Sequence, residues 1–186
     1  ITSSGPDNVR TSGAAVAVPL EGAHREACFA GAEALTPLAT AYARARGTDR
    51  LASFGDFVAL SDTVDLRTAQ LIRQEVSDGV IAPGYAPEAL ALLAGKRDGR
   101  YLVLRIDPGY EPPPMESRTV FGVRLEQRRN DAPIGPALLG RVATARRDLG
   151  PEAVRDLVVA LVTLKYTQSN SVCLARDGQT IGVGAG

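Results

Sequence analysis

The sequence is poor in the residues that metal sites and many nucleophilic enzymes require. His24 is the only histidine among the 186 residues, and Cys28 and Cys173 are the only cysteines. A zinc site needs three or four His, Cys or carboxylate ligands, so no structural or catalytic zinc is expected. A serine or cysteine nucleophile would have to use His24 as its base. Because His24 lies in the polar segment 21–26, a surface histidine is the simpler interpretation.

An excess of charge and a long apolar run are also absent. The 21 Lys and Arg balance the 21 Asp and Glu, so we expect neither nucleic acid nor a membrane surface as a partner. The apolar stretch from Val154 to Leu164 is far shorter than the roughly 20 residues of a membrane span. Two isolated cysteines do not suggest a disulfide framework, and no leader segment opens the chain, which begins with Ile1. We therefore expect a cytoplasmic protein whose start has been trimmed or processed.

Hydrophobic periodicity predicts alternating helices and strands. Apolar positions three and four residues apart before Gly47 predict a helix, and short apolar runs bounded by Gly and Asp predict buried strands. Helices are expected at 32–46, 66–76, 87–93 and 151–166, strands at 57–60, 80–82, 101–106 and 118–127, a proline-rich loop at 107–115, and a hairpin from 170–175 and 179–183. This order indicates an α/β fold with helices on both faces of a mixed sheet, in a single domain over residues 1–186.

Three polar clusters adjoin the predicted strands, at residues 53–56, 77–79 and 167–171. Asp accepts hydrogen bonds from amino groups, Asn makes paired contacts and Gly allows a close backbone approach, so the clusters suit a polar heterocycle. The alternative is that Asp and Gly form turns and the hydroxyls cap helix ends, and the residue types alone leave both readings open. The glycine-rich segment 182–186 could cradle a phosphate, although a flexible loop after a strand is the simpler interpretation.

Together, three stretches closely resemble one enzyme family: LTPLATAYARARGTDRLASFGDFVALSD (35–62), EVSDGVIAPGY (75–85) and KYTQSNSVCLARDGQTIGVGAG (165–186). The family is AICAR transformylase, the transformylase region of the bifunctional purine biosynthesis enzyme AICAR formyltransferase/IMP cyclohydrolase. The resemblance extends from about Gly13 to the end of the sequence and is weakest in the proline-rich loop. It is specific, because KYTQSNSVC and SFGDFVALSD are not generic patterns.

The resemblance implies a nucleotide-binding transferase of purine or purine-like nucleoside biosynthesis. In the family, a formyl group passes from the folate co-substrate 10-formyltetrahydrofolate to aminoimidazole carboxamide ribonucleotide. The implied fold is a three-layer α/β/α unit like that of cytidine deaminases, used twice in the family. This chain matches roughly the first unit, and the cyclohydrolase domain has no counterpart in it. Because family sites are built across a homodimer interface, a dimer mate or a second chain is expected.

Several residues match positions with roles in the family. Gly55 matches a glycine that contacts the nucleotide, Asp78 an aspartate at the heterocycle, and Asn170 an asparagine that holds the carboxamide. Leu51 falls where the family places a methionine near the folate. A structural potassium ion, present in some members, is implied near three hydroxyl residues: Thr167, Ser169 and Ser171.

One departure concerns the catalytic pair. Aligned back from Gly13, the Lys-His pair of the family falls on Asp7 and Asn8. The family's histidine accepts a proton near the amine and its lysine stabilises developing charge, and Asp with Asn cannot do both. Losing a positioned acid or base costs about 10² to 10⁴ in rate, and a carboxylate in place of a cation reverses the electrostatics near an oxyanion. Asp7 could still act as a base, whereas Asn8 could only orient.

Two functional readings follow. In the first, the chain is a divergent formyltransferase that acts with a partner chain on a related amino-carboxamide nucleotide, as Gly55, Asp78 and Asn170 suggest. In the second, it is a non-catalytic nucleotide-binding or assembly subunit, as Asp7, Asn8 and the missing second unit suggest. A partner chain that supplies the missing half would favour the first reading.

Overall fold

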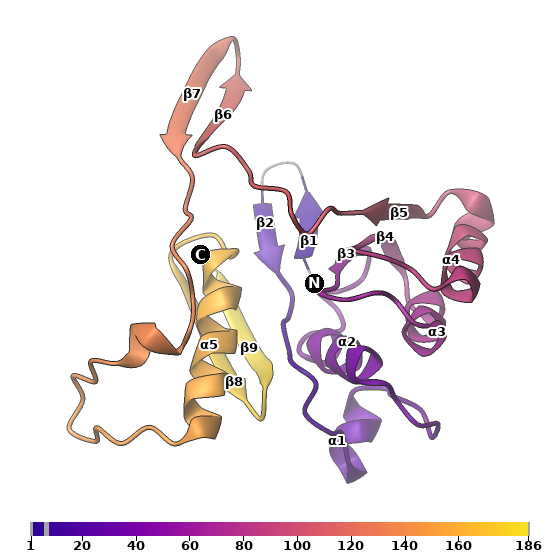
Figure 1. Ribbon diagram of the computed structural model, residues 1–186, viewed down its shortest axis with the longest axis horizontal. Helices are drawn as coiled ribbons and strands as arrows, with labels where there is room; N and C mark the ends of the chain where they lie inside the picture. Colours follow the sequence, from indigo (N-terminus) through magenta and orange to yellow (C-terminus); the bar gives the residue numbers. More distant parts are fainter. Residues whose placement is uncertain (1, 6–7, 186) are drawn as a thin grey trace.

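The computed structural model describes residues 2–5 and 8–185, with side chains placed from residue 12 onward. Its helices and strands follow one another along the chain as Figure 1 shows. The helices are α1 (Gly22–Ala27), α2 (Pro37–Gly47), α3 (Leu66–Gln74), α4 (Pro87–Ala94) and α5 (Pro151–Lys165), with 3-10 turns η1 (Lys96–Gly99) and η2 (Pro136–Leu139). The strands are β1 (Thr2–Gly5), β2 (Asn8–Thr11), β3 (Asp56–Ala59), β4 (Ser77–Ala82), β5 (Leu102–Arg105), β6 (Met115–Val120), β7 (Val123–Arg128), β8 (Ser171–Arg176) and β9 (Gln179–Ala185). Among the described residues, no helix combines the length and apolar character that crossing a bilayer requires.

Side-chain caps fix where the central helices begin. The Thr36 hydroxyl accepts from the Ala39 amide at 3.2 Å at the start of α2, and Asp65 Oδ1 accepts from the Thr68 amide at 2.8 Å at the start of α3. Thr36 also donates to Asp65 Oδ2 at 2.8 Å, so the two caps are joined. Each cap satisfies an amide that the first helical turn leaves without a partner. The joined caps hold the starts of α2 and α3 side by side.

The main sheet has the strand order β2-β1-β3-β4-β5. The strands β3, β4 and β5 run parallel, and β1 joins β3 in the antiparallel sense. The register sets Phe57 beside Gly79, and Gly79 beside Leu102. The predicted mixed α/β architecture is therefore confirmed.

The helices α2, α3 and α4 contribute to one core on one face of this sheet. Val58, Val80 and Ala82 are fully buried there with Ile72 of α3 and Leu93 of α4.

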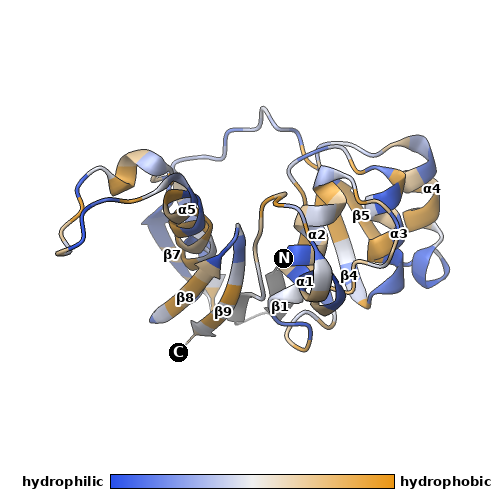
Figure 2. Ribbon diagram, turned by 90° about the horizontal axis from the view of Figure 1, so that it is seen from below, coloured by the Kyte–Doolittle hydropathy of each residue, from blue (hydrophilic) through white to orange (hydrophobic). Residues whose placement is uncertain are grey.

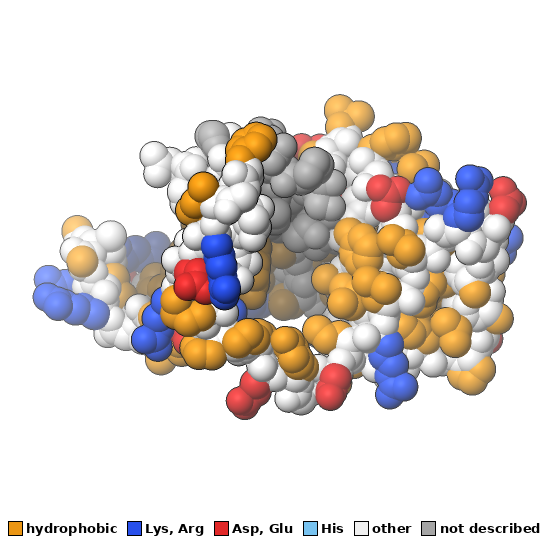
Figure 3. All heavy atoms as spheres, turned by 90° about the horizontal axis from the view of Figure 1, so that it is seen from above, with side chains coloured by type: hydrophobic (Ala, Val, Ile, Leu, Met, Phe, Trp, Pro, Cys, Tyr) orange, Lys and Arg blue, Asp and Glu red, His pale blue; other side chains and the backbone are white. Residues whose placement is uncertain are grey.

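The opposite face of the sheet stays partly open. Leu102 and Leu104 are 54% and 44% exposed, and the view from above shows hydrophobic side chains gathered on this side (Figure 3). The expected second layer of helices is not found within the described residues. The proline-rich segment forms the predicted loop, which leads from β5 into β6.

The prediction of one strand over 118–127 was wrong. The chain reverses at Phe121 and Gly122, which have φ values of 48° and 81°, and the segment becomes the antiparallel hairpin β6–β7. A two-residue turn with both φ angles positive favours glycine and matches the twist of a hairpin. The alternating pattern was read correctly as extended, but the turn within it was missed. The hairpin extends away from the main sheet (Figure 1).

In the C-terminal part, α5 packs against the hairpin β8–β9. The predicted hairpin is confirmed, with its turn at Asp177 and Gly178. Arg44 of α2 joins this part to the rest of the molecule. Its guanidinium donates to Pro19 O at 2.7 Å, to Asp177 O at 3.0 Å and to Gln179 Oε1 at 3.3 Å. Arg44 is only 2% exposed, so these contacts are buried and join segments distant in sequence. Figure 2 shows the two parts side by side.

The segment around His24, which was interpreted as carrying a surface histidine, forms the short helix α1. His24 is partly buried, and its Nε2 lies 2.9 Å from Gln179 Oε1. Gln179 also accepts from Arg44. The histidine thus belongs to the contacts that hold β9, which is a structural role.

Candidate functional site

Gly55 and Asp78 lie beside each other at the amino ends of β3 and β4. The Gly55 amide donates to Val76 O at 3.1 Å, and Asp56 pairs with Ser77 in the register of the two strands. Gly55 has a φ of 75°, and no atom lies within 4 Å of where its Cβ would be. The backbone conformation, rather than crowding, therefore requires glycine here. The structure thus places Gly55 directly before β3 and Asp78 near the start of the neighbouring strand β4.

A buried ion-pair network lies beneath this region. Arg46 Nη1 contacts both oxygens of Asp56 at 2.8 Å, and Arg46 Nη2 donates to Val76 O at 3.1 Å. Glu75 extends the network, with Oε2 at 3.1 Å from Arg46 Nε and Oε1 at 2.6 Å from Arg50 Nη2. Burial raises the pKa of Asp56, and the hydrogen bond from Arg46 opposes that rise. The network joins the segment before β3 to the segment before β4.

Lys96 supplies a second buried cation on the β4 side. Its ammonium donates to Ile72 O at 2.7 Å, to Glu75 O at 2.6 Å and to Ser77 Oγ at 3.0 Å. It also lies 4.5 Å from the centre of the Tyr101 ring, a cation–π contact. Burial lowers the pKa of Lys96 to about 8. Lys96 thereby attaches the η1 turn to the start of β4.

Asp78 itself points to solvent and carries one ion pair. Its Oδ1 lies 2.6 Å from Arg97 Nη1, and the side chains of Asp78 and Arg97 are 59% and 49% exposed. The carboxylate is therefore accessible to a ligand while a neighbouring guanidinium contacts it.

The third predicted cluster follows α5 and is placed differently. Thr167 is buried and donates to Thr163 O at 2.7 Å, whereas Ser169 and Asn170 are exposed and Ser171, which begins β8, is partly exposed. Among the described residues, no hydrogen bond or ion pair connects Asn170 to Gly55 or Asp78. The chain therefore forms the Gly55 and Asp78 part of the predicted site as one unit and presents Asn170 separately.

Exposed apolar side chains flank Gly55. Leu51 is 91% exposed and Phe54 is 72% exposed, and Phe54 N donates to Leu51 O at 3.2 Å. The guanidinium of Arg50 lies 4.0 Å from the centre of the Phe29 ring, which is 63% exposed. Large apolar side chains left in water next to a polar turn are typical of a surface that a ligand or partner covers.

The catalytic positions fall at the edge of what the structure describes. Asp7 lies outside the described residues, and Asn8 begins β2 but its side chain is not described. Within the described part of the chain, no group of three or more His, Cys, Asp or Glu is placed to hold a metal ion.

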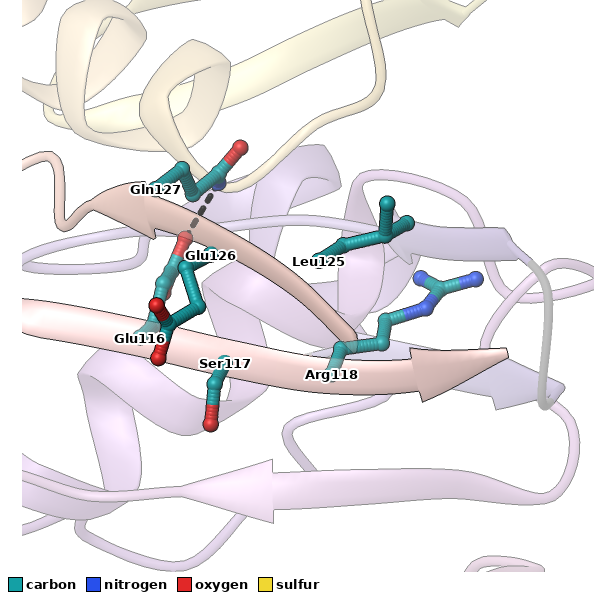
Figure 4. Close-up of a pocket in the computed structure, with 6 residues that line it drawn as sticks. All are labelled: Glu116, Ser117, Arg118, Leu125, Glu126 and Gln127. Carbon is teal, nitrogen blue, oxygen red and sulfur yellow. Dashed lines mark hydrogen bonds between the residues drawn. The ribbon is translucent and has the colours of Figure 1, made fainter. Parts of the chain in front are cut away.

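A hollow of about 580 Å³ follows the β6–β7 hairpin, away from these residues. Figure 4 shows the side chains that line it, with Gln127 donating to Glu116 across the two strands. None of the predicted site residues lines this hollow, and it holds no nucleophile paired with a base. It is a feature of the hairpin surface and not a candidate active site.

Sequence reasoning missed the residues beneath the site: Arg46, Glu75, Lys96 and Arg97. Two signals were present. Lys96 is one of only two lysines, in a chain where the other cations are arginine. Arg46 and Arg50 are four residues apart, a spacing that places both on one side of a helix end.

Comparison with known proteins points to one family. The sequence pattern described as AICARFT/IMPCHase bienzyme matches residues 11–186. "Bifunctional purine biosynthesis protein PurH" of Cereibacter sphaeroides (strain ATCC 17029 / ATH 2.4.9) is 39% identical over 149 residues, which are 80% of this chain and 28% of that protein. The protein of the same name from Synechococcus sp. (strain CC9311) is 38% identical over 146 residues, 78% of this chain and 27% of its own length. The chain thus spans just over a quarter of the length of these relatives.

Proposed function

The chain belongs to the AICARFT/IMPCHase bienzyme family, and from this membership we propose that it is a formyltransferase-like protein of purine or purine-like nucleoside biosynthesis. The acceptor is an aminoimidazole carboxamide ribonucleotide or a related amino-carboxamide nucleotide, and the donor is the folate co-substrate 10-formyltetrahydrofolate. The observation that supports the proposal is the position of Gly55 and Asp78 at the amino ends of the neighbouring strands β3 and β4, whose preceding segments the buried Arg46 joins.

Each site residue has a role that suits its surroundings. Gly55 lets the nucleotide approach the backbone, since the space above it is open. The exposed Asp78 carboxylate accepts from an amino group of the heterocycle, and Asn170 holds the carboxamide. Leu51 and Phe54 offer apolar surface to the folate. To complete the site, Asn170 must face Asp78. We propose that a dimer mate or a partner chain brings these two residues together.

The open face of the sheet supports the same assembly. Residues 1–186 form the first transformylase unit, and the unit becomes a three-layer, cytidine-deaminase-like fold when a further layer covers Leu102 and Leu104. Apolar side chains that stay about half exposed on one face of a sheet favour such a cover. The rest of the assembly supplies that layer.

The proposal also includes a potassium ion, because the oxygen atoms of this segment are of a type that binds such ions. Hydroxyl and carbonyl oxygens suit hard cations, and Thr167, Ser169 and Ser171 present such oxygens within five residues. Because Thr167 Oγ1 gives its proton to Thr163 O, its lone pairs remain free to contact a cation. The ion would fix the shape of the segment that carries Asn170.

The chemistry depends on Asp7 and Asn8. The acceptor amine is a poor nucleophile because its electrons are drawn into the ring and the carboxamide, so a base at this step matters. An aspartate at position 7 is a weaker base than histidine, and its carboxylate repels a developing oxyanion. We therefore expect formyl transfer to aminoimidazole carboxamide ribonucleotide to be slow in the parent chain.

A formyl-transfer assay with 10-formyltetrahydrofolate tests this proposal, in the protein as it occurs with any chain that co-purifies. The double change Asp7→Lys with Asn8→His should raise turnover of aminoimidazole carboxamide ribonucleotide. Fast turnover by the parent that is unaffected by Asp7→Ala or Asn8→Ala would show that another base does the work.

The second candidate, a non-catalytic nucleotide-binding or assembly subunit, is favoured by the Asp7 and Asn8 substitutions. It predicts nucleotide binding without transfer to any amino-carboxamide acceptor, even after the Lys-His pair is restored.

A further inference from the structure

We propose that Arg97 is a positioning residue that orients the Asp78 carboxylate for the nucleotide. This inference rests on the proposed function, in which Asp78 faces the heterocycle. Nothing in the sequence patterns that identify the family singles out Arg97.

The contact between the two side chains leaves half of the carboxylate free. Arg97 Nη1 lies 2.6 Å from Asp78 Oδ1, and among the described residues Oδ2 carries no hydrogen bond. A guanidinium on one oxygen restricts the orientation of a carboxylate, because a charge-assisted hydrogen bond is directional. The second oxygen is then held toward solvent, where it can accept from a ligand amine.

The backbone of the η1 turn places Arg97 at an energetic cost. Arg97 and Asp98 have φ values of 54° and 56°, a left-handed conformation that is uncommon for residues other than glycine. The turn is anchored on one side by the three buried hydrogen bonds of Lys96 and followed by Gly99, with a φ of 79°. Strain of this kind persists only where the surrounding structure enforces it, and it clusters at functional sites.

Stability alone does not account for this arrangement. An ion pair between two half-exposed side chains contributes little to folding, because water screens it and both side chains lose rotamer freedom. Two strained residues therefore support a contact that adds almost nothing to the fold. The contact between Arg97 and Asp78 is explained if it orients a carboxylate that binds the ligand.

A double-mutant cycle on nucleotide affinity tests the proposal. Aminoimidazole carboxamide ribonucleotide is titrated calorimetrically into the parent, Asp78→Ala, Arg97→Ala and the double variant, all as the full chain with any co-purifying partner. Arg97→Lys tests rescue by a conservative cation, and Arg100→Ala is the matched control on the same turn. Urea unfolding of every variant reports whether the fold has changed.

The proposal expects Asp78→Ala to weaken binding about 5-fold to 100-fold, as for a lost hydrogen bond to a charged group. Arg97→Ala should weaken it at least about 3-fold when Asp78 is present and less than about 2-fold in the Asp78→Ala background, because the two act as one unit. Arg97→Lys should recover part of the loss. Arg100→Ala should bind as the parent does, and the urea midpoint of Arg97→Ala should be unchanged.

The other outcomes separate the two claims. If Asp78→Ala weakens binding but Arg97→Ala does not, the nucleotide site stands and the role of Arg97 is refuted. Equal losses in both backgrounds, or a lowered urea midpoint, would show that Arg97 acts directly or structurally, which also refutes it. Tighter binding by Arg97→Ala would make Arg97 an obstacle to the ligand. If Asp78→Ala has no effect, the assignment of Asp78 itself is wrong and the inference is overturned with it.

Discussion

Arg46 of α2 places one guanidinium nitrogen 2.8 Å from both carboxylate oxygens of Asp56 of β3, and the side chains are only 4% and 0% exposed. The same guanidinium donates to Val76 O just before β4. A helix end thus controls the relative position of the two segments that carry Gly55 and Asp78. A buried ion pair of this kind adds little to the net free energy of unfolding, because both charges lose their hydration. Its main effect here is to hold the two segments in a fixed relative position.

Removing one partner of this pair should be costly. Arg46→Ala leaves Asp56 as an uncompensated buried charge, and we expect a loss of about 3 to 5 kcal/mol in the free energy of unfolding. Urea denaturation measures it. Arg73→Ala, on the exposed face of α3, should change the same quantity by less than about 0.5 kcal/mol. A loss below 1 kcal/mol for Arg46→Ala would mean that the pair is not buried in solution.

Lys96 should make the free energy of unfolding depend on pH in the alkaline range. Its pKa is about 8 in the folded protein, lowered by burial from 10.5, so above pH 8 the folded state releases a proton that the unfolded state keeps up to its own pKa. Stability from this group therefore rises between pH 8 and 10. Above pH 10 the trend reverses, since burial raises the pKa of Tyr101 to about 12 and the unfolded tyrosine ionises first.

Urea unfolding of Lys96→Met at several pH values checks this expectation. The variant should be less stable at neutral pH, because buried carbonyls lose a donor, and it should lack the rise between pH 8 and 10. Lys165→Met, which removes the other lysine, should keep the parent profile. An unchanged profile in Lys96→Met would contradict the buried position of the ammonium.

Gly79 should not tolerate a side chain, although it lies in a regular strand. A Cβ there would lie 2.4 Å from Phe57 Cε2 and 2.9 Å from Leu102 Cβ, so Gly79→Ala should destabilise the protein by about 1 to 3 kcal/mol through overpacking. Gly182→Ala in β9 is the matched control, because nothing lies within 4 Å of its Cβ position. Equal thermal midpoints for the two variants would refute the close approach of β3 and β5 side chains over Gly79.

Arg44 should hold the C-terminal hairpin against the rest of the molecule. Arg44→Met leaves Pro19 O and Asp177 O without their donor, so we expect a loss of at least about 2 kcal/mol in the free energy of unfolding. Hydrogen exchange should accelerate in β9 more than in β4. Uniform exchange across both strands would indicate that Arg44 contributes only to global stability.

The sequence predicted the positions of the helices and strands of residues 35–106 well, because periodicity and cap residues such as Asp65 are local signals. The prediction that the strand at 101–106 is buried was wrong, because β5 lies at the sheet edge with Leu102 and Leu104 about half exposed. The sequence-based prediction failed where the structure depends on contacts between residues that are far apart in the sequence. The turn at Phe121 and Gly122 divides a stretch whose alternation alone reads as one strand. The polar motifs around Gly55 and Asp78 were recognisable, but Arg46 and Lys96 show their function only when the fold brings them beneath β3 and β4. The separation of Asn170 from Asp78 was likewise not visible in the sequence.

The central claim is that Asp78 and Asn170 read an amino-carboxamide nucleotide together. Calorimetric titration of aminoimidazole carboxamide ribonucleotide into the parent and the two single alanine variants, each with any chain that co-purifies, tests it most directly. A lost hydrogen bond to the ligand costs roughly 1 to 3 kcal/mol, so Asp78→Ala and Asn170→Ala should each weaken binding by more than about threefold. If both variants bind within about threefold of the parent, or the parent does not bind the nucleotide, the proposed site is wrong.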